Sequence, residues 1–397
     1  MYDHDVRLVT AEKPIFIYSE ATPVDDDIPA PGLYRASVPI LKAIADHISM
    51  IALYPLDRRY GMNSIHPSLR PLGRALPSAF SWFRPVRKRL LRDDFENGAV
   101  AYVAGHWARR SGASHVFSLE GSDPEVLARV EAVANRAGLP FSVYLVDDFA
   151  WTMRLHGKSE AEIAATAARM RKILSRARHL FAITDELGAL LTEQFGLTAT
   201  TLRLGFEIKP APSPPRKDQI FFLGSINFLC VSALKTLIET VRCLRVETGR
   251  DIVIRFTCDP QAALGQLPSF VHAAPIPGAN ALAQEIAASL FAFLPYSFDE
   301  TLRTMVKTSF PSKSMECLAY ARSIVVFAPA YSNSARFFTA AALPTVTLTP
   351  AALEQTIRQH LAVPPDHSRQ YRDYLDRRHA PAAIRETLLS TLSGMTT

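Results

Sequence analysis

One stretch of the chain, TSFPSKSMECLAYARSIVVF at 308–327, combines residue types that bind phosphate with a pattern that would position them. Thr308, Ser309 and Ser312 offer hydroxyl groups just ahead of a segment whose apolar residues recur at helical spacing. A helix that begins at the carboxyl end of a parallel strand presents free backbone N–H groups and a partial positive charge, so phosphate is its natural ligand. Lys313 adds a cation in the expected first turn.

Glu316 follows Lys313 by three positions, and its carboxylate is expected to reach hydroxyl groups such as those of a ribose. A second interpretation is that Glu316 only offsets the helix dipole and that Lys313 is a solvated surface residue. The local pattern leaves both interpretations open.

Two adjacent carboxylates form the second candidate site. Asp147 and Asp148 directly follow the apolar run at 141–146, and ligands bind at the carboxyl ends of strands in open α/β sheets. Burial or a neighbour's charge would raise the pKa of one carboxylate enough for it to deprotonate an acceptor hydroxyl. Alternatively, Asp148 caps the following segment and Asp147 is structural. Glu120 follows the expected strand at 115–119, and an acceptor-side role and a turn-forming role are both open for it.

The expected elements alternate between strands and helices in both halves of the chain. In the first half, apolar runs predict strands at 14–18, 48–53, 115–119, 141–146, 179–183 and 200–204. Helical periodicity lies between them, at 35–47, 94–110, 124–137, 159–178 and 185–195. The second half predicts strands at 219–223, 252–257, 290–294, 324–327 and 346–348, and helices at 232–248 and 281–288. The alternation favours parallel sheets with right-handed crossovers.

This repetition predicts an α/β protein with two Rossmann-like parallel-sheet domains facing across a cleft. The Pro-rich basic segment KPAPSPPRK at 209–217 is expected to be a stiff linker. The N-terminal domain is then expected at 1–208 and the C-terminal domain at 218–365. Helices at 366–397 would pack back on the N-terminal domain.

Composition excludes several classes of protein. The 397 residues are 48% apolar and 21% charged, as in a globular rather than a disordered protein. No apolar run approaches the roughly twenty residues of a membrane span, and the N-terminus lacks the apolar core of a signal peptide. The four cysteines show neither metal-ligand nor redox spacing, which favours a reducing cytoplasm. His106, His115 and His156 are isolated in the sequence and also lack metal-ligand spacing, so no metal is expected. No G-x-G-x-x-G follows the first strand, so no dinucleotide cofactor is expected.

A basic and aromatic stretch, Arg58–Arg92, lies between the second and third expected strands. Its cations are Arg58, Arg59, Arg70, Arg74, Arg84, Arg87, Lys88, Arg89 and Arg92, with Phe80, Trp82 and Phe83 among them. Cations beside aromatics suit the headgroup region of an anionic membrane, where each cation contributes about 1 kcal/mol. Phosphate contacts to nucleic acid and a solvated face are the alternatives. We favour the membrane surface and expect no nucleic-acid partner.

The stretch at 308–327 resembles the donor-site motif of glycosyltransferases with the GT-B fold, especially glycosyltransferase family 4. In that motif a P-x-K-x-x-E helix start follows the nucleotide-sugar loop and precedes a buried strand. Pro311, Lys313 and Glu316 match the helix start. ARSIVV at 321–326 stands where the strand belongs.

The resemblance also assigns residues outside that motif. Gly224 and Ser225 match the family's glycine turn close to the diphosphate, where a missing Cβ lets backbone approach oxygen, and Asn227 belongs to the same turn. Ser225 replaces an arginine that is frequent in the family, and Thr308 stands where a first glutamate is usual. The charge of the leaving diphosphate is then expected to be met by Arg303, Lys307 and Lys313.

VYLVDDF at 143–149 is similar to the segment in which glucuronosyltransferases of xanthan assembly end a strand with an aspartate acting as base. The resemblance implies an enzyme that moves a hexosyl or glycuronosyl group from a nucleoside diphosphate sugar to a saccharide or lipid-linked acceptor, without a metal. Such an enzyme would serve polysaccharide or glycolipid assembly at the inner face of the plasma membrane. A non-catalytic scaffold, an epimerase and a phosphorylase of the same fold are the alternatives.

Overall fold

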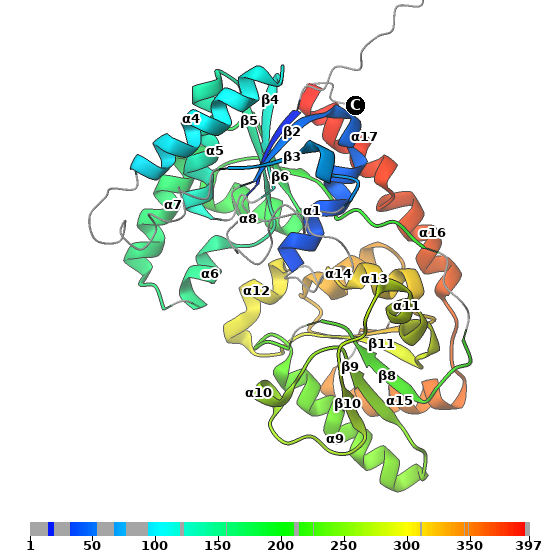
Figure 1. Cartoon of the computed structure of the whole chain (residues 1–397). Helices are drawn as coiled ribbons and strands as arrows, with labels where there is room; N and C mark the ends of the chain where they lie inside the picture. The colour runs from blue at the N-terminus through cyan, green and yellow to red at the C-terminus, as the bar shows by residue number, and fades with distance from the viewer. Residues whose placement is uncertain are drawn as a thin grey trace, which may run out of the picture. The chain divides into compact units, whose positions relative to one another are not determined.

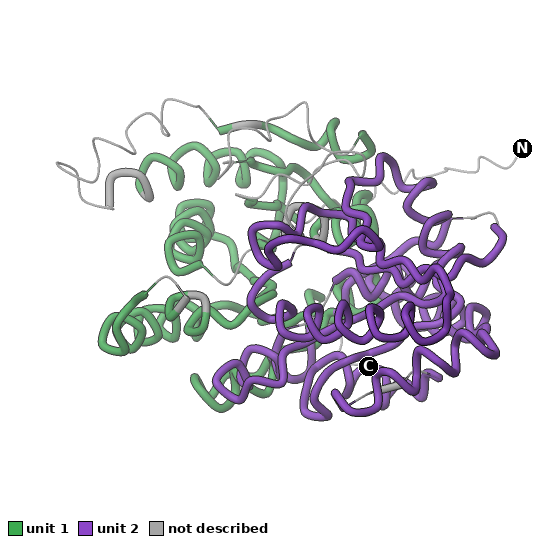
Figure 2. The backbone as a smooth tube through the Cα atoms, turned by 90° about the horizontal axis from the view of Figure 1, so that it is seen from below, with its two compact units in different colours: residues 1–183, 188–202, 385–397 green, residues 184–187, 203–384 purple. Residues whose placement is uncertain are grey.

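The computed structural model of the chain consists of two compact units (Figure 1, Figure 2). It describes residues 15–19, 32–53, 67–76, 94–119, 123–155, 157–209, 214–224, 226–309, 312–344, 346–347 and 349–393. Unit 1 comprises residues 1–183, 188–202 and 385–397, and unit 2 comprises residues 184–187 and 203–384. The segment expected as a linker, 209–217, therefore falls inside unit 2, and the expected C-terminal helices are divided between the units.

Unit 1 is built on seven parallel strands in the order β3-β2-β1-β4-β5-β6-β7. The strands are β1 (Ile15–Ser19), β2 (Ile48–Leu53), β3 (Gly73–Ala75), β4 (His115–Ser118), β5 (Phe141–Leu145), β6 (His179–Ala182) and β7 (Thr200–Thr201). β1 and β5 are buried at every position, as parallel strands covered on both faces should be. The strand order reverses between β1 and β4, because β2 and β3 extend the sheet on the other side of β1.

Helices alternate with these strands. They are α1 (Gly32–Ala43), η1 (Ala45–His47), η3 (Arg70–Leu72), α4 (Asp94–Arg110), α5 (Pro124–Ala137), α6 (Phe149–Leu155), α7 (Glu160–Leu174), α8 (Asp185–Phe195) and α17 (Pro381–Ser393). The sequence sets the ends of α5 locally. The Asp123 carboxylate accepts hydrogen bonds from the backbone N–H groups of Glu125 and Val126, at 2.7 and 3.3 Å. Gly138 ends the helix in the left-handed conformation that glycine favours.

Two expectations for unit 1 are wrong. The helix expected at 159–178 ends at Leu174, because the Arg178 N–H already donates to the Phe141 carbonyl at 2.8 Å, which starts the pairing of β6 with β5. The sequence analysis also did not predict β3. This strand lies inside the Arg58–Arg92 stretch and pairs in parallel with β2. β3 has three residues, too short for periodicity to reveal.

Unit 2 is built on six parallel strands in the order β10-β9-β8-β11-β12-β13. The strands are β8 (Gln219–Phe222), β9 (Val253–Phe256), β10 (Val271–Ala273), β11 (Phe291–Pro295), β12 (Ile324–Phe327) and β13 (Val346–Thr347). The chain runs outward from β8 to β10 and then returns to place β11 on the other side of β8. Ligands of open α/β sheets bind outside the carboxyl ends of the strands at such a reversal.

The helices of unit 2 are α9 (Val231–Thr248), α10 (Gln261–Leu264), α11 (Ala279–Ala288), η4 (Glu300–Leu302), α12 (Arg303–Thr308), α13 (Ser314–Tyr320), α14 (Asn333–Ala340), η5 (Pro350–Ala352), α15 (Leu353–Ala362) and α16 (Ser368–Arg378). Sequence analysis predicted no element at β10, α12 or α14. The start of α14 does carry a local signal, since the Ser332 hydroxyl accepts a hydrogen bond from the Ala335 N–H at 3.0 Å. Among the described helices, none combines the length and the apolar character needed to cross a membrane.

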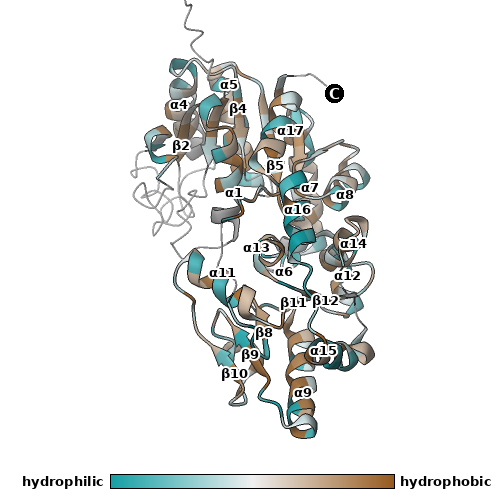
Figure 3. Ribbon diagram, turned by 90° about the vertical axis from the view of Figure 1, so that its right-hand side faces the viewer, coloured by the Kyte–Doolittle hydropathy of each residue, from teal (hydrophilic) through white to brown (hydrophobic). Residues whose placement is uncertain are grey.

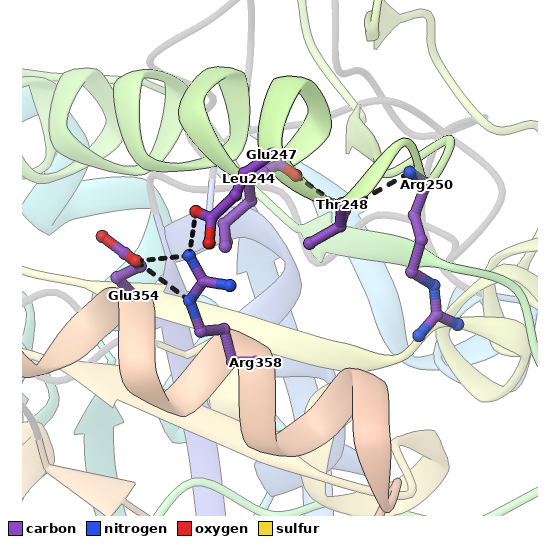
Figure 4. Close-up of polar contacts among 6 residues, drawn as sticks. All are labelled: Leu244, Glu247, Thr248, Arg250, Glu354 and Arg358. Atoms are coloured by element: carbon purple, nitrogen blue, oxygen red, sulfur yellow. Dashed lines mark hydrogen bonds and ion pairs between the residues drawn. The ribbon is translucent and has the colours of Figure 1, made fainter.

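Helices α9 and α15 pack against each other over the unit 2 sheet, and Leu237 and Ile357 belong to one buried cluster with its strands. Figure 3 shows the same division, with brown strands inside and teal on many helix surfaces. At the rim of this contact, Arg358 donates to Glu354 at 2.8 Å and also pairs with Glu247 of α9 (Figure 4). These exposed pairs contribute little beside the apolar core.

Hydrogen bonds within unit 2 hold the chain on both sides of residues 210–213. The Lys209 N–H donates to the Tyr320 hydroxyl at 3.4 Å, and Arg322 donates to the Pro214 carbonyl at 2.7 Å. Both partners lie at the carboxyl end of α13, so Lys209 and Pro214 are each bound within unit 2.

Candidate functional site

The carboxyl edge of the unit 2 sheet carries the residues that sequence analysis assigned to a phosphate ligand. Gly224 follows β8, and Lys313 stands between β11 and β12 at the start of α13. Thr257, which sequence analysis did not assign, follows β9 at the same edge. Because all these strands are parallel, their carboxyl ends lie at the same edge. The strand order reverses between β8 and β11, so the point of reversal lies between Gly224 and Lys313 along this edge.

The side chain of Lys313 lies close to Gly224. Gly224 has a φ of +123°, which L side chains rarely adopt. A Cβ built on Gly224 would lie 3.6 Å from Cγ of Lys313. The Gly224 N–H donates to Oγ1 of Thr257 at 3.2 Å, which fixes the turn. The lysine stem therefore lies beside Gly224.

Lys313 and Glu316 form an ion pair at this edge. Nζ of Lys313 donates to Oε1 of Glu316 at 3.3 Å. The two side chains are only 25% and 20% exposed, so both charges have lost part of their hydration. The structure thus brings Gly224, Lys313 and Glu316 together as the sequence suggested, with a cation and a carboxylate side by side.

Among the described residues, none of the hydroxyl groups that precede α13 caps this helix. Lys313 itself is the N-cap residue, and no side chain caps the helix. The buried Thr308 hydroxyl instead donates to the Thr304 carbonyl at 3.0 Å, inside α12. The reason is that 303–308 forms a helix of its own, which uses the Thr308 hydroxyl locally.

Three other assigned residues make mostly structural contacts. The Ser309 carbonyl accepts from the Tyr296 hydroxyl at 3.3 Å, and the Ser312 carbonyl accepts from the Met315 N–H at 3.2 Å. Oδ1 of Asn227 accepts from the Leu229 N–H at 3.0 Å, which shapes the entry to α9. The bonds of Ser309 and Ser312 use their backbone carbonyls, and all three contacts help to position the edge.

The two cations of α12 differ. Arg303 pairs with Glu300 at 2.8 Å and lies over the Tyr331 ring at 4.1 Å, so its charge is largely compensated. The Glu300 carboxylate also raises the pKa of Arg303. Lys307 is exposed in the last turn of α12.

Some assigned residues lie outside the described part of the chain. They are Glu120, Ser225 and most of the Arg58–Arg92 stretch. Within the described segment 67–76, Arg74 donates to the carbonyls of Pro71 and Gly73, at 3.2 and 2.7 Å.

A cavity of about 600 Å³ opens on the same edge of unit 2, between the first turn of α9 and the loop after β11. Its lining includes Phe228, Ser232, Ser297, Phe298, Asp299 and Leu302. Ser232 donates to Ser297 at 3.4 Å, and the Asp299 N–H donates to the same hydroxyl at 3.1 Å. Sequence analysis missed these residues, although Ser297 and Asp299 stand just after a buried strand.

The Asp147 and Asp148 pair lies at the carboxyl end of β5 in unit 1, where sequence analysis expected it. Asp148 is 8% exposed, and its Oδ1 accepts from the Ala150 N–H at 3.1 Å. This bond caps α6, one of the two alternatives that the sequence left open. The Asp147 side chain reaches solvent instead.

Both carboxyl groups of the pair have raised pKa values. Asp147 is partly exposed to solvent, but the protein atoms around its carboxyl group exclude enough water to raise its pKa. The negative charge of Asp148 raises the pKa of Asp147 further. Burial also raises the pKa of Asp148, against the lowering effects of the Ala150 N–H and of Arg154. Two adjacent carboxylates of this kind hold a proton more readily than isolated ones, and the more exposed one can exchange it with a ligand.

The described residues contain no cluster of three or more His, Cys, Asp or Glu side chains arranged to hold a metal ion. Two described histidines of unit 1 lie away from the aspartate pair, at the opposite ends of their strands. Nε2 of His115 is 2.8 Å from the Ser142 hydroxyl, and the His115 ring stacks on His179 at 6.5 Å. All three residues lie in β4, β5 and β6, with both histidines at the amino ends of their strands.

Comparison with known proteins identifies the fold. No family model matches the sequence, and no similar curated protein is found. A lipopolysaccharide outer core galactosyltransferase, WaaB, matches with a TM-score of 0.60 at 11% identity, over 96% of this chain and 99% of that one. Sucrose-phosphate synthase from Thermosynechococcus elongatus matches with a TM-score of 0.64 at 12% identity, over 96% and 98%.

A third solved structure holds a nucleotide. S. aureus TarM, in complex with Fondaparinux, alpha-GlcNAc-glycerol and UDP, matches with a TM-score of 0.52 at 11% identity. That match covers 75% of this chain and 58% of the TarM chain. At such identities the likeness concerns the fold, and the chain has the GT-B fold expected from its sequence.

Proposed function

We propose that the chain is a glycosyltransferase that moves a sugar from a nucleoside diphosphate donor to a saccharide or lipid-linked acceptor. One observation carries the proposal: the Lys313 side chain lies beside Gly224 and pairs with Glu316, at the strand reversal of unit 2. The solved structures of similar fold include a galactosyltransferase and a protein in complex with UDP, which supports the same reaction class.

In this proposal unit 2 holds the donor. The Lys313 ammonium would bind the diphosphate, whose two negative charges attract it more strongly than Glu316 alone. Glu316 would then accept hydrogen bonds from the ribose hydroxyls, and Lys307 would add a second cation. The cavity beside α9 has a volume typical of ligand sites and offers room for the rest of the donor.

In the same proposal the aspartate pair of unit 1 supplies the base. The acceptor hydroxyl would give its proton to one carboxylate and form a bond to the anomeric carbon of the sugar. The bond from that carbon to the diphosphate breaks, and Lys313 stabilises the charge of the leaving group. No metal is required by these steps, and the product would have the inverted configuration. Hexosyl and glycuronosyl donors both fit this scheme.

The acceptor part of the proposal concerns surface polysaccharide or glycolipid assembly. It rests on the composition of the Arg58–Arg92 stretch, which suits an anionic membrane surface. Vesicles with anionic lipid should bind the protein, and added salt should release it. Equal co-sedimentation with neutral and anionic vesicles would reject membrane binding by this stretch. It would not affect the proposal that unit 2 binds a nucleotide sugar.

The central test is nucleotide binding. Calorimetric titration with UDP-, GDP-, ADP- and dTDP-sugars should identify at least one donor, and Lys313→Ala should weaken its binding about tenfold or more. Lys217→Ala is the matched control, because Lys217 forms the same kind of pair with Glu285, also at 3.3 Å, before the first strand of the same sheet. Equal losses in the two variants, or no donor in the panel, would overturn the proposal.

A further inference from the structure

A further cavity, of about 170 Å³, lies at one edge of the unit 1 sheet. Its lining comes from two segments, one from the end of α7 into β6 and one between α8 and the start of β7. β6 and β7 are parallel, and both begin at this edge. Asp147 follows β5, which is parallel to β6, so the aspartate pair lies at the opposite edge. The cavity is therefore distinct from the site of the proposed base.

The polar side chains of this lining carry positive charge or hydroxyl groups. They are the guanidinium of Arg178, the imidazole of His179, and the hydroxyl groups of Ser175, Thr198 and Thr200. None of the lining residues is an aspartate or a glutamate. The cavity thus has one permanent charge, which is positive.

Arg178 has no carboxylate partner among the described residues. Two positions earlier, Arg176 forms an ion pair with Glu131 at 2.5 Å and does not line the cavity. The Arg178 backbone is fixed at the start of β6 because its N–H donates to the Phe141 carbonyl at 2.8 Å, whereas its side chain is exposed. A guanidinium of this kind suits an oxyanion, which it can bind through two parallel hydrogen bonds.

The His179 ring offers a second donor. Nε2 of His179 is buried, and no described residue forms a hydrogen bond with it. Burial and the charge of Arg178 lower the pKa of His179, so its ring is neutral at pH 7 and carries one N–H. In the tautomer with that N–H at Nε2, the ring would donate to an anion in the cavity. A buried group without a partner costs free energy, which a bound acceptor would recover.

A cation fits this cavity less well than an anion, because the end of α7 offers it few oxygen ligands. Each of the last four carbonyl groups of α7, 171–174, accepts a hydrogen bond from residues 175–177. The carboxyl end of a helix attracts cations through such carbonyl groups, and here they are already paired. A hard metal ion would also favour carboxylate ligands, which the lining lacks.

We propose that this cavity is a binding site for a small oxyanion of the size of phosphate or sulfate. Arg178 would supply the charge, and the His179 ring and the Thr198 and Thr200 hydroxyl groups would supply further hydrogen bonds. The volume exceeds the roughly 10–15 Å³ that one water occupies and is below the roughly 300 Å³ at which sites for drug-sized ligands begin. All these residues belong to unit 1, so the site does not depend on the donor binding proposed for unit 2.

The experiment titrates the full chain carrying Lys313→Ala with inorganic phosphate, so that the proposed donor site does not bind the anion as well. Calorimetry at pH 7 and constant ionic strength should show saturable binding with a Kd of about 1 mM, since a five-atom ligand cannot reach the affinity of a nucleotide. Adding Arg178→Gln should weaken this binding about tenfold or more, because the charge and the paired hydrogen bonds are lost.

Arg176→Gln in the same background is the matched control, because Arg176 is equally exposed and lies outside the lining. It should keep the affinity for phosphate. Equal losses in Arg178→Gln and Arg176→Gln would show that general positive charge attracts the anion, and would overturn the proposal. The absence of saturable binding in Lys313→Ala would overturn it as well.

NMR of the same protein, labelled with ¹⁵N in its histidines, locates the bound anion. Phosphate should shift the ring signal that His179→Gln removes, with the Kd found by calorimetry. Sulfate should shift the same signal, and chloride should not. Calorimetric binding without a shift of the His179 signal would place the anion elsewhere and reject this site.

Discussion

Gly224 and Lys313 meet at the edge of the unit 2 sheet, where a Cβ on Gly224 would lie 3.6 Å from the lysine Cγ. That distance is an ordinary contact, so the space beside Gly224 would admit a methyl group. The backbone conformation would not, because the φ of Gly224 is +123°. Glycine is therefore required here by the backbone conformation of the turn and not by lack of space.

Gly224→Ala should therefore destabilise the folded protein by about 1–3 kcal/mol through backbone strain. It should also weaken nucleotide binding, because relief of the strain would move the turn away from Lys313. Urea unfolding and calorimetric titration measure the two effects. Gly98→Ala is the control, since Gly98 lies in α4 with nothing within 4 Å of an added Cβ, and alanine there should stabilise the helix slightly. A neutral Gly224→Ala would contradict the strain argument.

Glu316→Ala should weaken donor binding by about 1.5–3 kcal/mol, the contribution of a charge-assisted hydrogen bond to a ribose hydroxyl. Binding of inorganic pyrophosphate should change much less, because it lacks the ribose and the Glu316 carboxylate would no longer compete for Lys313. Glu285→Ala removes the comparable partner of Lys217 in α11 and serves as the control. If donor and pyrophosphate affinities fall together, Glu316 acts by positioning Lys313.

The sequence predicted the strands well because buried parallel strands are continuous apolar runs bounded by polar residues. The strand expected at 48–53 is β2, and that expected at 324–327 is β12. Shorter elements were not predicted. β10 has three residues and α12 has six, which is too few for a periodic pattern of apolar residues to be recognised.

The candidate site likewise has features that the sequence predicted and features that it could not predict. Lys313 and Glu316 are neighbours in the sequence, so their pairing was predictable, and both alternatives for Asp148 were visible beforehand. The contact of Lys313 with Gly224 depends on how β8, β11 and β12 are ordered in the sheet, and no local pattern encodes that order.

Stability in acid should depend on His115. Burial lowers its pKa to about 4, with the charges of His179 and Arg178 adding to the effect. A histidine whose pKa is lower in the folded state stabilises the fold fully above its unfolded pKa of about 6.5, and this stability is lost as pH falls toward 4. On the order of 3 kcal/mol is expected from such a difference.

The fluorescence of tryptophan can follow this loss, because Trp82, Trp107 and Trp151 all lie in the residue range of unit 1. Urea unfolding monitored in this way should show a smaller free energy at pH 5 than at pH 7. His115→Gln keeps a partner for Ser142 and cannot titrate, so its stability should vary less between these values. A parent protein and a variant with equal pH dependence would show that other groups control acid unfolding.

The aspartate pair gives the sharpest prediction, because the structure distinguishes its members. Oδ1 of Asp148 caps α6, whereas the Asp147 side chain reaches solvent. Asp147→Asn should therefore lower turnover by about 10²–10⁴-fold, the usual contribution of a positioned base. Asp148→Asn should retain most activity, since asparagine caps helices about as well as aspartate. Donor affinity should be nearly unchanged in both variants, because unit 2 carries the proposed donor residues.

The pH profile of the parent enzyme follows from the same geometry. A base acts only when deprotonated, and the surrounding protein and the charge of Asp148 raise the pKa of Asp147. Turnover should therefore rise with pH through a midpoint above the ordinary value of 3.8 for an aspartate, and Asp147→Asn should lose this rise. Proton NMR of the product glycoside gives the deciding measurement. Direct attack by a hydroxyl that Asp147 deprotonates inverts the anomeric carbon, whereas retention of configuration would reject the base role even if Asp147→Asn were inactive.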